Sequence, residues 1–203
     1  MPPASRWHRP NESGPPCPAC PGFGRWRRCR GWLWASRPAA WARPSAGAVV
    51  LRPYRRGGLV RHVNSAIYWS PARFQREFQV HRALWAAGLP TVEPLGWACR
   101  RRLWGWEGVY LSRFAYAAPW PRAWDRAVPA QLRVLLDALC AWGLYAPDLN
   151  ATNVLVDPSG AILTLDWDRA WWTPEAGLMQ RYRERLIRSL RKLGAPSAIV
   201  EAF

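Results

Sequence analysis

Three polar side chains in the C-terminal third of the chain, Asp148, Asn153 and Asp166, have the residue types that phosphoryl transfer requires. The segment between Asn153 and Asp166 predicts a hairpin, because two apolar runs flank the turn residues of 158–160. A hairpin brings its two ends together, so Asn153 and Asp166 are expected to lie close to one another. Mg²⁺ takes few protein ligands, mostly carboxylate or amide oxygens, and completes its shell with water and substrate phosphate. The pair therefore predicts a magnesium site.

Asp148 precedes this hairpin, in the loop that follows a predicted amphipathic helix over 129–143. A carboxylate in this loop can accept a proton from a hydroxyl group, or orient that group, while a nearby metal ion neutralises developing charge. The alternative is that Asp148 and Asn153 only cap turns, as these residue types often do. The combination of both pieces, joined by a hairpin, favours a catalytic function for Asp148.

The remaining patterns predict an α+β chain arranged in two lobes. Apolar runs bounded by turn residues predict strands at 48–54, 91–99 and 106–114. A helix is expected to begin at Ser70, whose hydroxyl can cap it ahead of a proline, and to end at Gly88.

The composition changes along the chain and suggests where its domain begins. Residues 1–30 are rich in proline, arginine and tryptophan and show no periodicity, so they are predicted to form a flexible extension. Residues 31–203 are expected to form the folded domain, with a small β-rich N-lobe over about 31–115. A reduced helical C-lobe over about 116–203 would end in a basic helix over about 175–193.

The charge and the aromatic content suggest an anionic partner. The net charge is +16 and the chain has 16 tryptophans, which suits an anionic membrane surface, a nucleic acid or a phosphorylated substrate. A compositional bias toward arginine is the alternative, because Lys192 is the only lysine. No apolar run approaches the roughly 18 residues that span a bilayer, and no secretory signal is evident. We therefore expect a cytoplasmic protein that can associate with a membrane surface.

The cysteines raise the question of a structural metal. Cys17 and Cys20 have metal-ligand spacing, and Cys29 could supply a third thiolate. A structural zinc ion needs four ligands, for which only His8 is a nearby candidate. Free thiols in a reducing compartment are the alternative.

The segments DLNATN, which begins at Asp148, and LDWD, which contains Asp166, resemble the catalytic loop and the metal-binding turn of protein kinases. Kinases also pair a basic strand residue with a helix glutamate, and this pair holds the nucleotide phosphates. The resemblance assigns these positions to Arg52 and Glu77. A solvated helix acid is the alternative interpretation of Glu77.

Taken in order, the segments between about 36 and 195 resemble the Kdo kinase family, the bacterial lipopolysaccharide kinases related to protein kinases. The segments are VLRPYRRGGLV, REFQVHRAL, GLPTVEPLG, DLNATNVLVD, LTLDWDRA and RLIRSLRKL. The resemblance implies a protein-kinase-like fold, with ATP and Mg²⁺ as cofactors. It also implies phosphorylation of the 3-deoxy-manno-octulosonic acid (Kdo) sugar of Kdo-lipid A in lipopolysaccharide core biosynthesis. The implied location is peripheral, on the cytoplasmic face of the bacterial inner membrane, and no nucleic acid is expected as a partner.

The sequence departs from this family in two places. Ala146 stands two residues before Asp148, where the family has a histidine that supports the loop, and the first strands lack the glycines expected over the phosphates. A degenerate pseudokinase, or a kinase of another small hydroxyl acceptor, therefore remains the alternative function.

Overall fold

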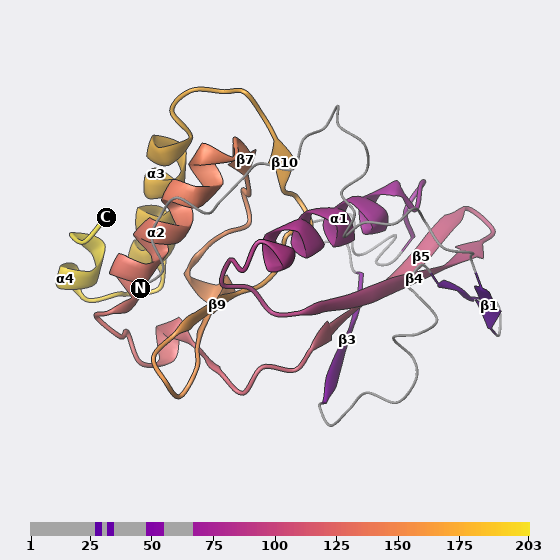
Figure 1. Ribbon diagram of the computed structural model, residues 1–203, viewed down its shortest axis with the longest axis horizontal. Helices are drawn as coiled ribbons and strands as arrows, with labels where there is room; N and C mark the ends of the chain where they lie inside the picture. Colours follow the sequence, from indigo (N-terminus) through magenta and orange to yellow (C-terminus); the bar gives the residue numbers. More distant parts are fainter. Residues whose placement is uncertain (1–26, 30–31, 35–47, 55–66) are drawn as a thin grey trace. The chain divides into compact units, whose positions relative to one another are not determined.

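The computed structural model describes residues 27–29, 32–34, 48–54 and 67–203. Their architecture is α+β, as expected (Figure 1). The strands are β1 (Arg27–Cys29), β2 (Trp32–Trp34), β3 (Val49–Pro53), β4 (Pro94–Arg102), β5 (Gly105–Arg113), β6 (Ala118–Pro119), β7 (Leu144–Tyr145), β8 (Val154–Val156), β9 (Ile162–Thr164) and β10 (Trp171–Trp172). The helices are α1 (Ala72–Ala86), α2 (Val128–Ala141), α3 (Leu178–Lys192) and α4 (Ser197–Val200), with 3-10 turns η4 (Trp120–Arg122) and η5 (Ala151–Asn153).

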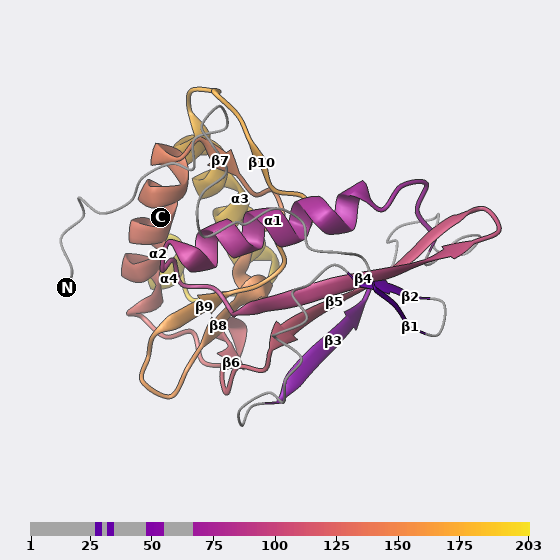
Figure 2. The same ribbon diagram turned by 45° about the vertical axis from the view of Figure 1, so that its right-hand side comes forward.

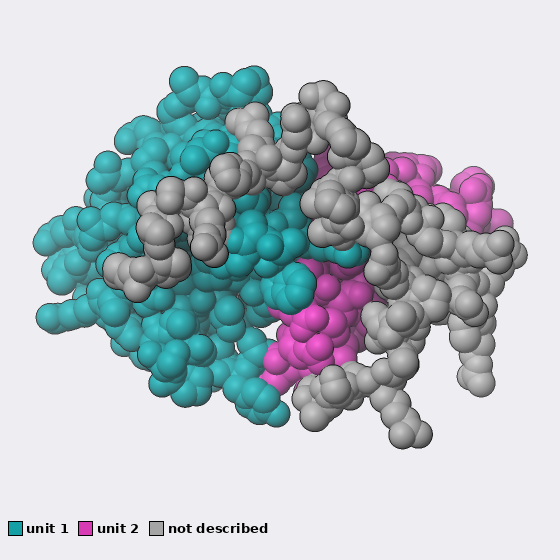
Figure 3. Space-filling view, in the orientation of Figure 1, with its two compact units in different colours: residues 1–10, 80–92, 115–203 teal, residues 11–79, 93–114 magenta. Residues whose placement is uncertain are grey.

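The chain divides into two compact units, coloured separately in Figure 3. Among the described residues, the helical unit consists of Val80–Val92 and Ala115–Phe203, and the sheet unit consists of Glu93–Phe114 and the residues up to Gln79. The boundaries predicted for the extension and for the two lobes stay predictions. In the part of the chain that the structure describes, no helix is both long enough and apolar enough to cross a membrane.

The sheet unit contains a five-stranded antiparallel sheet in the order β1-β2-β4-β5-β3. Its central strands β4 and β5 form a long hairpin, and β3 lies along β5 (Figure 2). Successive residues of β4 face opposite sides, as the period of a strand requires, so Trp97 and Ala98 belong to different apolar clusters. A Cβ at Gly108 would lie 2.7 Å from ring atoms of the buried Phe74, so this position accepts only glycine without a shift of the ring.

The helical unit is organised around α2 and α3. One side of α2 is buried, at Leu132, Leu135, Leu136 and Leu139, as is Trp142 directly after the helix. On α3 the buried residues follow one another at intervals of four, at Leu178, Tyr182, Leu186 and Leu190. Burial of each leucine contributes on the order of 2 kcal/mol to folding, so these apolar stripes fix both helices against the unit's core.

The predicted hairpin is present as β8 and β9, with Val154 paired to Thr164. Its turn is closed by Asp157, whose Oδ1 accepts hydrogen bonds from the backbone N–H groups of Ser159 (2.8 Å) and Ala161 (3.0 Å). Gly160 supplies the positive φ of 83° that this turn needs. The hairpin therefore presents its open end, at Asn153 and Leu165, toward the loop that contains Asp148.

Candidate active site

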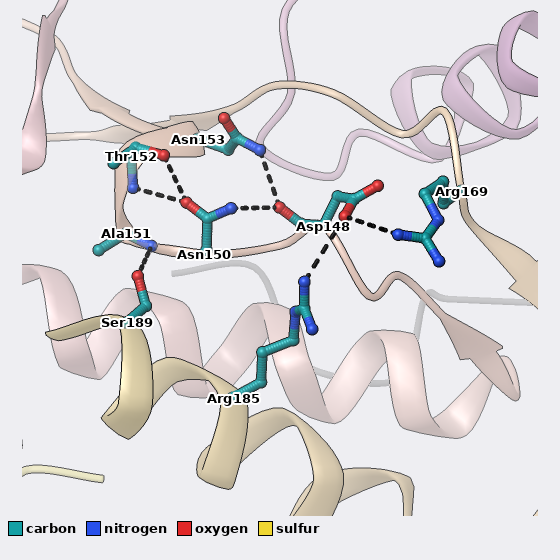
Figure 4. A network of polar contacts seen from close by, with 8 residues as sticks. All are labelled: Asp148, Asn150, Ala151, Thr152, Asn153, Arg169, Arg185 and Ser189. Carbon is teal, nitrogen blue, oxygen red and sulfur yellow. Dashed lines mark hydrogen bonds and ion pairs between the residues drawn. The ribbon is translucent and has the colours of Figure 1, made fainter. Parts of the chain in front are cut away.

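Asp148 lies in a loop between β7 and η5 that is closed by side-chain hydrogen bonds to its own backbone (Figure 4). The Asp148 carbonyl oxygen accepts hydrogen bonds from the side-chain amides of Asn153, at 2.8 Å, and Asn150, at 2.9 Å. The Oδ1 atom of Asn150 accepts in turn from the backbone N–H of Thr152, at 2.9 Å. The two asparagines therefore fix the backbone from which the Asp148 carboxylate projects.

Two arginines, from the segment after β9 and from α3, approach the Asp148 carboxylate. Its Oδ1 atom lies 3.5 Å from Nη2 of Arg185 and 3.8 Å from Nη1 of Arg169. The Asp148 side chain is 25% exposed, so a substrate can still reach it. Both distances exceed those of a charge-assisted hydrogen bond, so the arginines act on the carboxylate mainly through their charge.

The surroundings of Asp148 raise its pKa above that of an ordinary aspartate. Burial of the carboxyl group is the largest cause; Arg169 and Arg185 lower the pKa, and the neighbouring carboxylates of Asp166 and Asp168 raise it further. A carboxylate with a raised pKa is a better proton acceptor than an exposed one. This electrostatic environment suits a group that takes a proton from an alcohol.

The hairpin brings Asn153 and Asp166 to the same end, as predicted. The backbone N–H of Leu165 donates to the Asn153 carbonyl oxygen at 2.9 Å, and Asp166 is the next residue. Because the Nδ2 atom of Asn153 donates to the backbone of Asp148, its Oδ1 atom is the one available to ligate a cation. The carboxylates of Asp148 and Asp166 are near enough for one to raise the pKa of the other. Oxygen donors and clustered negative charge fit a hard divalent cation.

Asp166 adopts a left-handed backbone conformation, with φ of 63°. This region is uncommon for residues other than glycine, although aspartate and asparagine tolerate it better than most. Residues held in such conformations cluster at functional sites. The surrounding structure therefore holds the backbone of Asp166 in a conformation that this residue would otherwise seldom adopt.

A buried hydrogen-bond network around the Thr91 hydroxyl group holds this turn. The hydroxyl group of Thr91 donates to the Thr164 carbonyl oxygen at 2.9 Å, accepts from Trp167 Nε1 at 3.0 Å and lies 2.8 Å from His81 Nε2. A hydroxyl group has one proton to donate, so His81 must donate from Nε2. The network ties the residues on both sides of Asp166 to the segment 80–92.

Tyr182 of α3 supports the start of the loop that contains Asp148. Its hydroxyl group donates to the Leu144 carbonyl oxygen and accepts from the Ala146 backbone N–H, both at 2.8 Å. Burial raises the pKa of Tyr182 above its ordinary value, so the hydroxyl group keeps its proton. Ala146, where the family resemblance leads one to expect a histidine, is only 1% exposed. In this chain a tyrosine from another element makes polar contacts with the loop backbone at that position.

Arg52 and Glu77 are paired within the sheet unit. The guanidinium group of Arg52 donates to Glu77 Oε1, and the Tyr54 hydroxyl group donates to Glu77 Oε2. Glu77 is 1% exposed, so its interpretation as a solvated helix acid is wrong. The Arg52 guanidinium also lies over the rings of Tyr54, at 5.4 Å, and Tyr110, at 5.5 Å. These contacts fix the orientation of the arginine.

The described residues contain no group of three or more histidine, cysteine, aspartate and glutamate side chains that could hold a metal ion. The predicted magnesium ligands, Asn153 and Asp166, are one amide and one carboxylate, so they would not form such a group, and they stay a prediction. Cys17 and Cys20 lie outside the described residues, as does the side chain of Cys29.

Six residues of these contacts were not predicted from the sequence, namely Arg169, Arg185, Thr91, Trp167, Tyr182 and Tyr54. The only local signal was the basic character of the last helix, which did not single out Arg185 from its many arginine neighbours. The contacts of the other five depend on residues from distant elements, so no local pattern could have identified them.

Comparison with known proteins adds to this geometry. No family model matches the chain. A relative from Xylella fastidiosa (strain M12) is 33% identical over 77% of this chain and 68% of its own length. One from Xanthomonas oryzae pv. oryzae (strain PXO99A) is 32% identical over 72% and 63%, and one from Vibrio vulnificus (strain YJ016) is 28% identical over 70% and 64%. All three are named 3-deoxy-D-manno-octulosonic acid kinase.

The class of protein follows from these relatives together with the acidic loop and hairpin: the chain is a kinase, an enzyme that transfers a phosphoryl group. More particularly, it belongs to the 3-deoxy-D-manno-octulosonic acid kinase family, as its sequence resemblance predicted.

Proposed function

We propose that this enzyme transfers the γ-phosphoryl group of ATP to a hydroxyl group of the Kdo sugar of lipid A, in lipopolysaccharide core biosynthesis. The observation that carries the proposal is the Asp148 loop, in which a carboxylate of raised pKa projects from a backbone fixed by Asn153. The names of the relatives support a Kdo-containing acceptor. The proposal includes a two-lobed, protein-kinase-like arrangement of the fold.

In the proposed reaction Asp148 orients the acceptor hydroxyl group and takes its proton. The hydroxyl oxygen forms a bond to the γ-phosphorus of ATP, the proton passes to the Asp148 carboxylate, and the bond from the γ-phosphorus to its bridging oxygen breaks as ADP leaves. Asn153 and Asp166 would hold Mg²⁺, which when bound neutralises negative charge on the phosphates. The positive charges of Arg169 and Arg185 partly offset the negative charge of the Asp148 carboxylate, which limits how far its pKa rises.

We assign the binding of the nucleotide phosphates to Arg52. Glu77 and Tyr54 orient this arginine, and 40% of its side chain remains exposed, so a ligand can reach it. A guanidinium group can hold phosphate oxygens in a bidentate manner, which the ammonium group of a lysine does not do.

We further propose that the enzyme works at the cytoplasmic face of the inner membrane as a peripheral protein. The net charge of +16 supports attraction to anionic lipid. A lipid-anchored acceptor would also require the enzyme to approach a membrane surface.

A direct assay tests the proposed function. The purified chain is incubated with ATP, Mg²⁺ and Kdo-lipid A, and the product is examined by mass spectrometry for one added phosphate group. The Asp148→Asn variant serves as the control. ATP binding without any turnover would instead support the pseudokinase alternative, and phosphorylation of a different hydroxyl compound would support another acceptor.

A further inference from the structure

We propose that a basic pocket between the catalytic loop and α3 binds the carboxylate group of the sugar-acid acceptor; this inference rests on the proposed function. The pocket, called here the α3 pocket, has a volume of about 300 Å³. Its lining includes Asn150, Thr152, Arg185, Arg188, Ser189 and Lys192. The volume is at the lower end of the range for small-molecule sites, which suits part of a monosaccharide.

The α3 pocket is positively charged because one face of α3 carries three basic side chains. Arg185, Arg188 and Lys192 are separated by three and four residues, the spacing that places side chains on one helix face. Among the described residues that line the pocket, none is acidic. An anion would therefore be attracted to it.

Arg185 is not saturated by the contacts it makes. Its Nε atom is buried and has no hydrogen-bond partner among the described residues. Its Nη2 atom approaches Asp148 only to 3.5 Å, longer than a charge-assisted hydrogen bond. A buried donor without a partner is costly, so the present contacts of Arg185 leave part of its hydrogen-bonding capacity unused.

Two of the residues that line the pocket, Asn150 and Thr152, belong to the loop that follows Asp148, whose polar contacts are drawn in Figure 4. The backbone N–H of Ala151 donates to the Ser189 hydroxyl oxygen at 3.3 Å, which attaches the loop to α3. Asn150 lines the pocket and also donates to the Asp148 carbonyl oxygen. A ligand group in the α3 pocket would therefore lie beside Asn150, whose side chain is hydrogen-bonded to the backbone of Asp148.

The chemistry of the acceptor selects a carboxylate for this pocket. The relatives are named for an acid, and a sugar acid carries one carboxylate together with several hydroxyl groups of similar reactivity. A guanidinium group matches a carboxylate with two parallel hydrogen bonds. If Arg188 and Lys192 hold the carboxylate, only the hydroxyl group at a fixed distance from it reaches Asp148. The pocket thus both binds the acceptor and selects the hydroxyl group that reacts.

Kinetics of pocket variants test this inference. Arg188→Ala, Lys192→Ala and the double variant are compared with Arg191→Ala, an equally charged, exposed position on the same helix that does not line the pocket. With free 3-deoxy-D-manno-octulosonic acid as acceptor and saturating ATP, we expect KM for the acceptor to rise about tenfold or more in each pocket variant. The KM for ATP should stay within about twofold of the wild type, as should all constants of Arg191→Ala.

A second acceptor identifies the group that is bound. The carboxamide of the same sugar keeps the hydroxyl groups and removes the charge. Wild-type enzyme should prefer the acid by about tenfold or more in kcat/KM, and the double variant should lose that preference. A double variant that still discriminates between the two acceptors overturns the inference. A defect seen only with acceptor in anionic vesicles, and not with the free sugar, would also overturn it in favour of a phospholipid headgroup.

Binding measurements separate this inference from the proposed function. Titration calorimetry with the free sugar acid and with its carboxamide needs no turnover. Acid-selective binding that is lost in the double variant supports the pocket even if the assay with ATP fails. Turnover of the sugar by a wild-type enzyme whose acid affinity is unchanged by the double substitution refutes the pocket and leaves the proposed function intact.

Discussion

At the scale of single residues, the role proposed for Asp148 depends on its carboxylate rather than on its backbone, which the two asparagines hold. Asp148→Asn keeps the size of the side chain and removes the proton acceptor. We expect kcat to fall by roughly 10²- to 10⁴-fold, with little change in ATP affinity. Steady-state kinetics with an independent ATP-binding assay measures both. A variant with weakened ATP binding and an unchanged kcat would contradict this role.

The raised pKa of Asp148 has a consequence for pH dependence. Protonation removes the proton acceptor, so kcat/KM should fall on the acid side, beginning at a higher pH than an ordinary aspartate would produce. Arg169 lowers this pKa, so Arg169→Ala should raise it and move the acid limb to higher pH. A pH–rate profile of both proteins checks the direction. An acid limb that moves to lower pH in Arg169→Ala would show that another group is titrating.

Asp166 combines a proposed ligand with an uncommon backbone conformation, and two substitutions separate these roles. Asparagine tolerates a φ of 63°, so Asp166→Asn should fold normally but lose most of its turnover and need more Mg²⁺. Asp166→Ala should lose activity and also stability, by about 1 kcal/mol, because alanine tolerates this conformation less well. Thermal melts and Mg²⁺ titrations distinguish the two. Unchanged activity in Asp166→Asn would refute the metal assignment.

At the scale of secondary-structure elements, α3 supports the Asp148 loop through Tyr182. Tyr182→Phe removes the hydroxyl group that contacts Leu144 and Ala146, and leaves two buried backbone groups without this partner. We expect a loss of about 1–3 kcal/mol in unfolding free energy, together with a lower kcat. Denaturant unfolding and kinetics measure the two effects. Wild-type stability in Tyr182→Phe would show that the loop does not depend on this contact.

Ala146, whose backbone N–H donates to Tyr182, stands where the family resemblance leads one to expect a histidine. Ala146 is buried and belongs to the core of the helical unit, so Ala146→His would overpack it. Overpacking costs about 1–3 kcal/mol, and we expect lower stability with no gain in turnover. A more active Ala146→His enzyme would show that the loop can accommodate the ring after all.

The β4–β5 hairpin offers an element-scale test of membrane association. At its tip Leu103 is 85% exposed and Trp104 is 72% exposed, next to Arg101 and Arg102. Tryptophan and arginine together suit the interface of an anionic bilayer. Replacing Leu103 and Trp104 by serine should weaken binding to anionic vesicles in a flotation assay. Val134→Ser, which removes an apolar side chain that is 64% exposed on α2, is the control and should bind as the wild type does.

The flotation assay should also compare the binding of the wild-type protein at low and at high salt. Attraction of basic side chains to lipid is screened as ionic strength rises, so wild-type binding should weaken between low and high salt. No binding to anionic vesicles even at low salt would leave the charge of the chain as a compositional bias.

At the scale of the whole molecule, the features that local sequence specifies were predicted most accurately. The helix α1 begins where the Ser70 hydroxyl oxygen accepts the Ala72 N–H, and the β8–β9 hairpin forms around the expected turn. These features depend on capping and turn residues within a few positions. The Tyr182 contact joins residues 36 positions apart, and the hydrogen bond from Trp167 to Thr91 joins residues 76 apart. Such contacts arise only when the elements pack, so periodicity and spacing could not predict them.

Gly108 would provide a temperature-sensitive form of the enzyme. Gly108→Ala would press a methyl group against the Phe74 ring and weaken the sheet unit by about 1–3 kcal/mol, whereas Asp148 belongs to the helical unit. Cells that carry this allele should make an enzyme that works in the cold and fails on warming, with a normal kcat where it remains folded. Assays at two temperatures on Gly108→Ala check this expectation. In a bacterium that requires the phosphorylated product, the Gly108→Ala substitution would allow the activity of the enzyme to be controlled by temperature in genetic experiments.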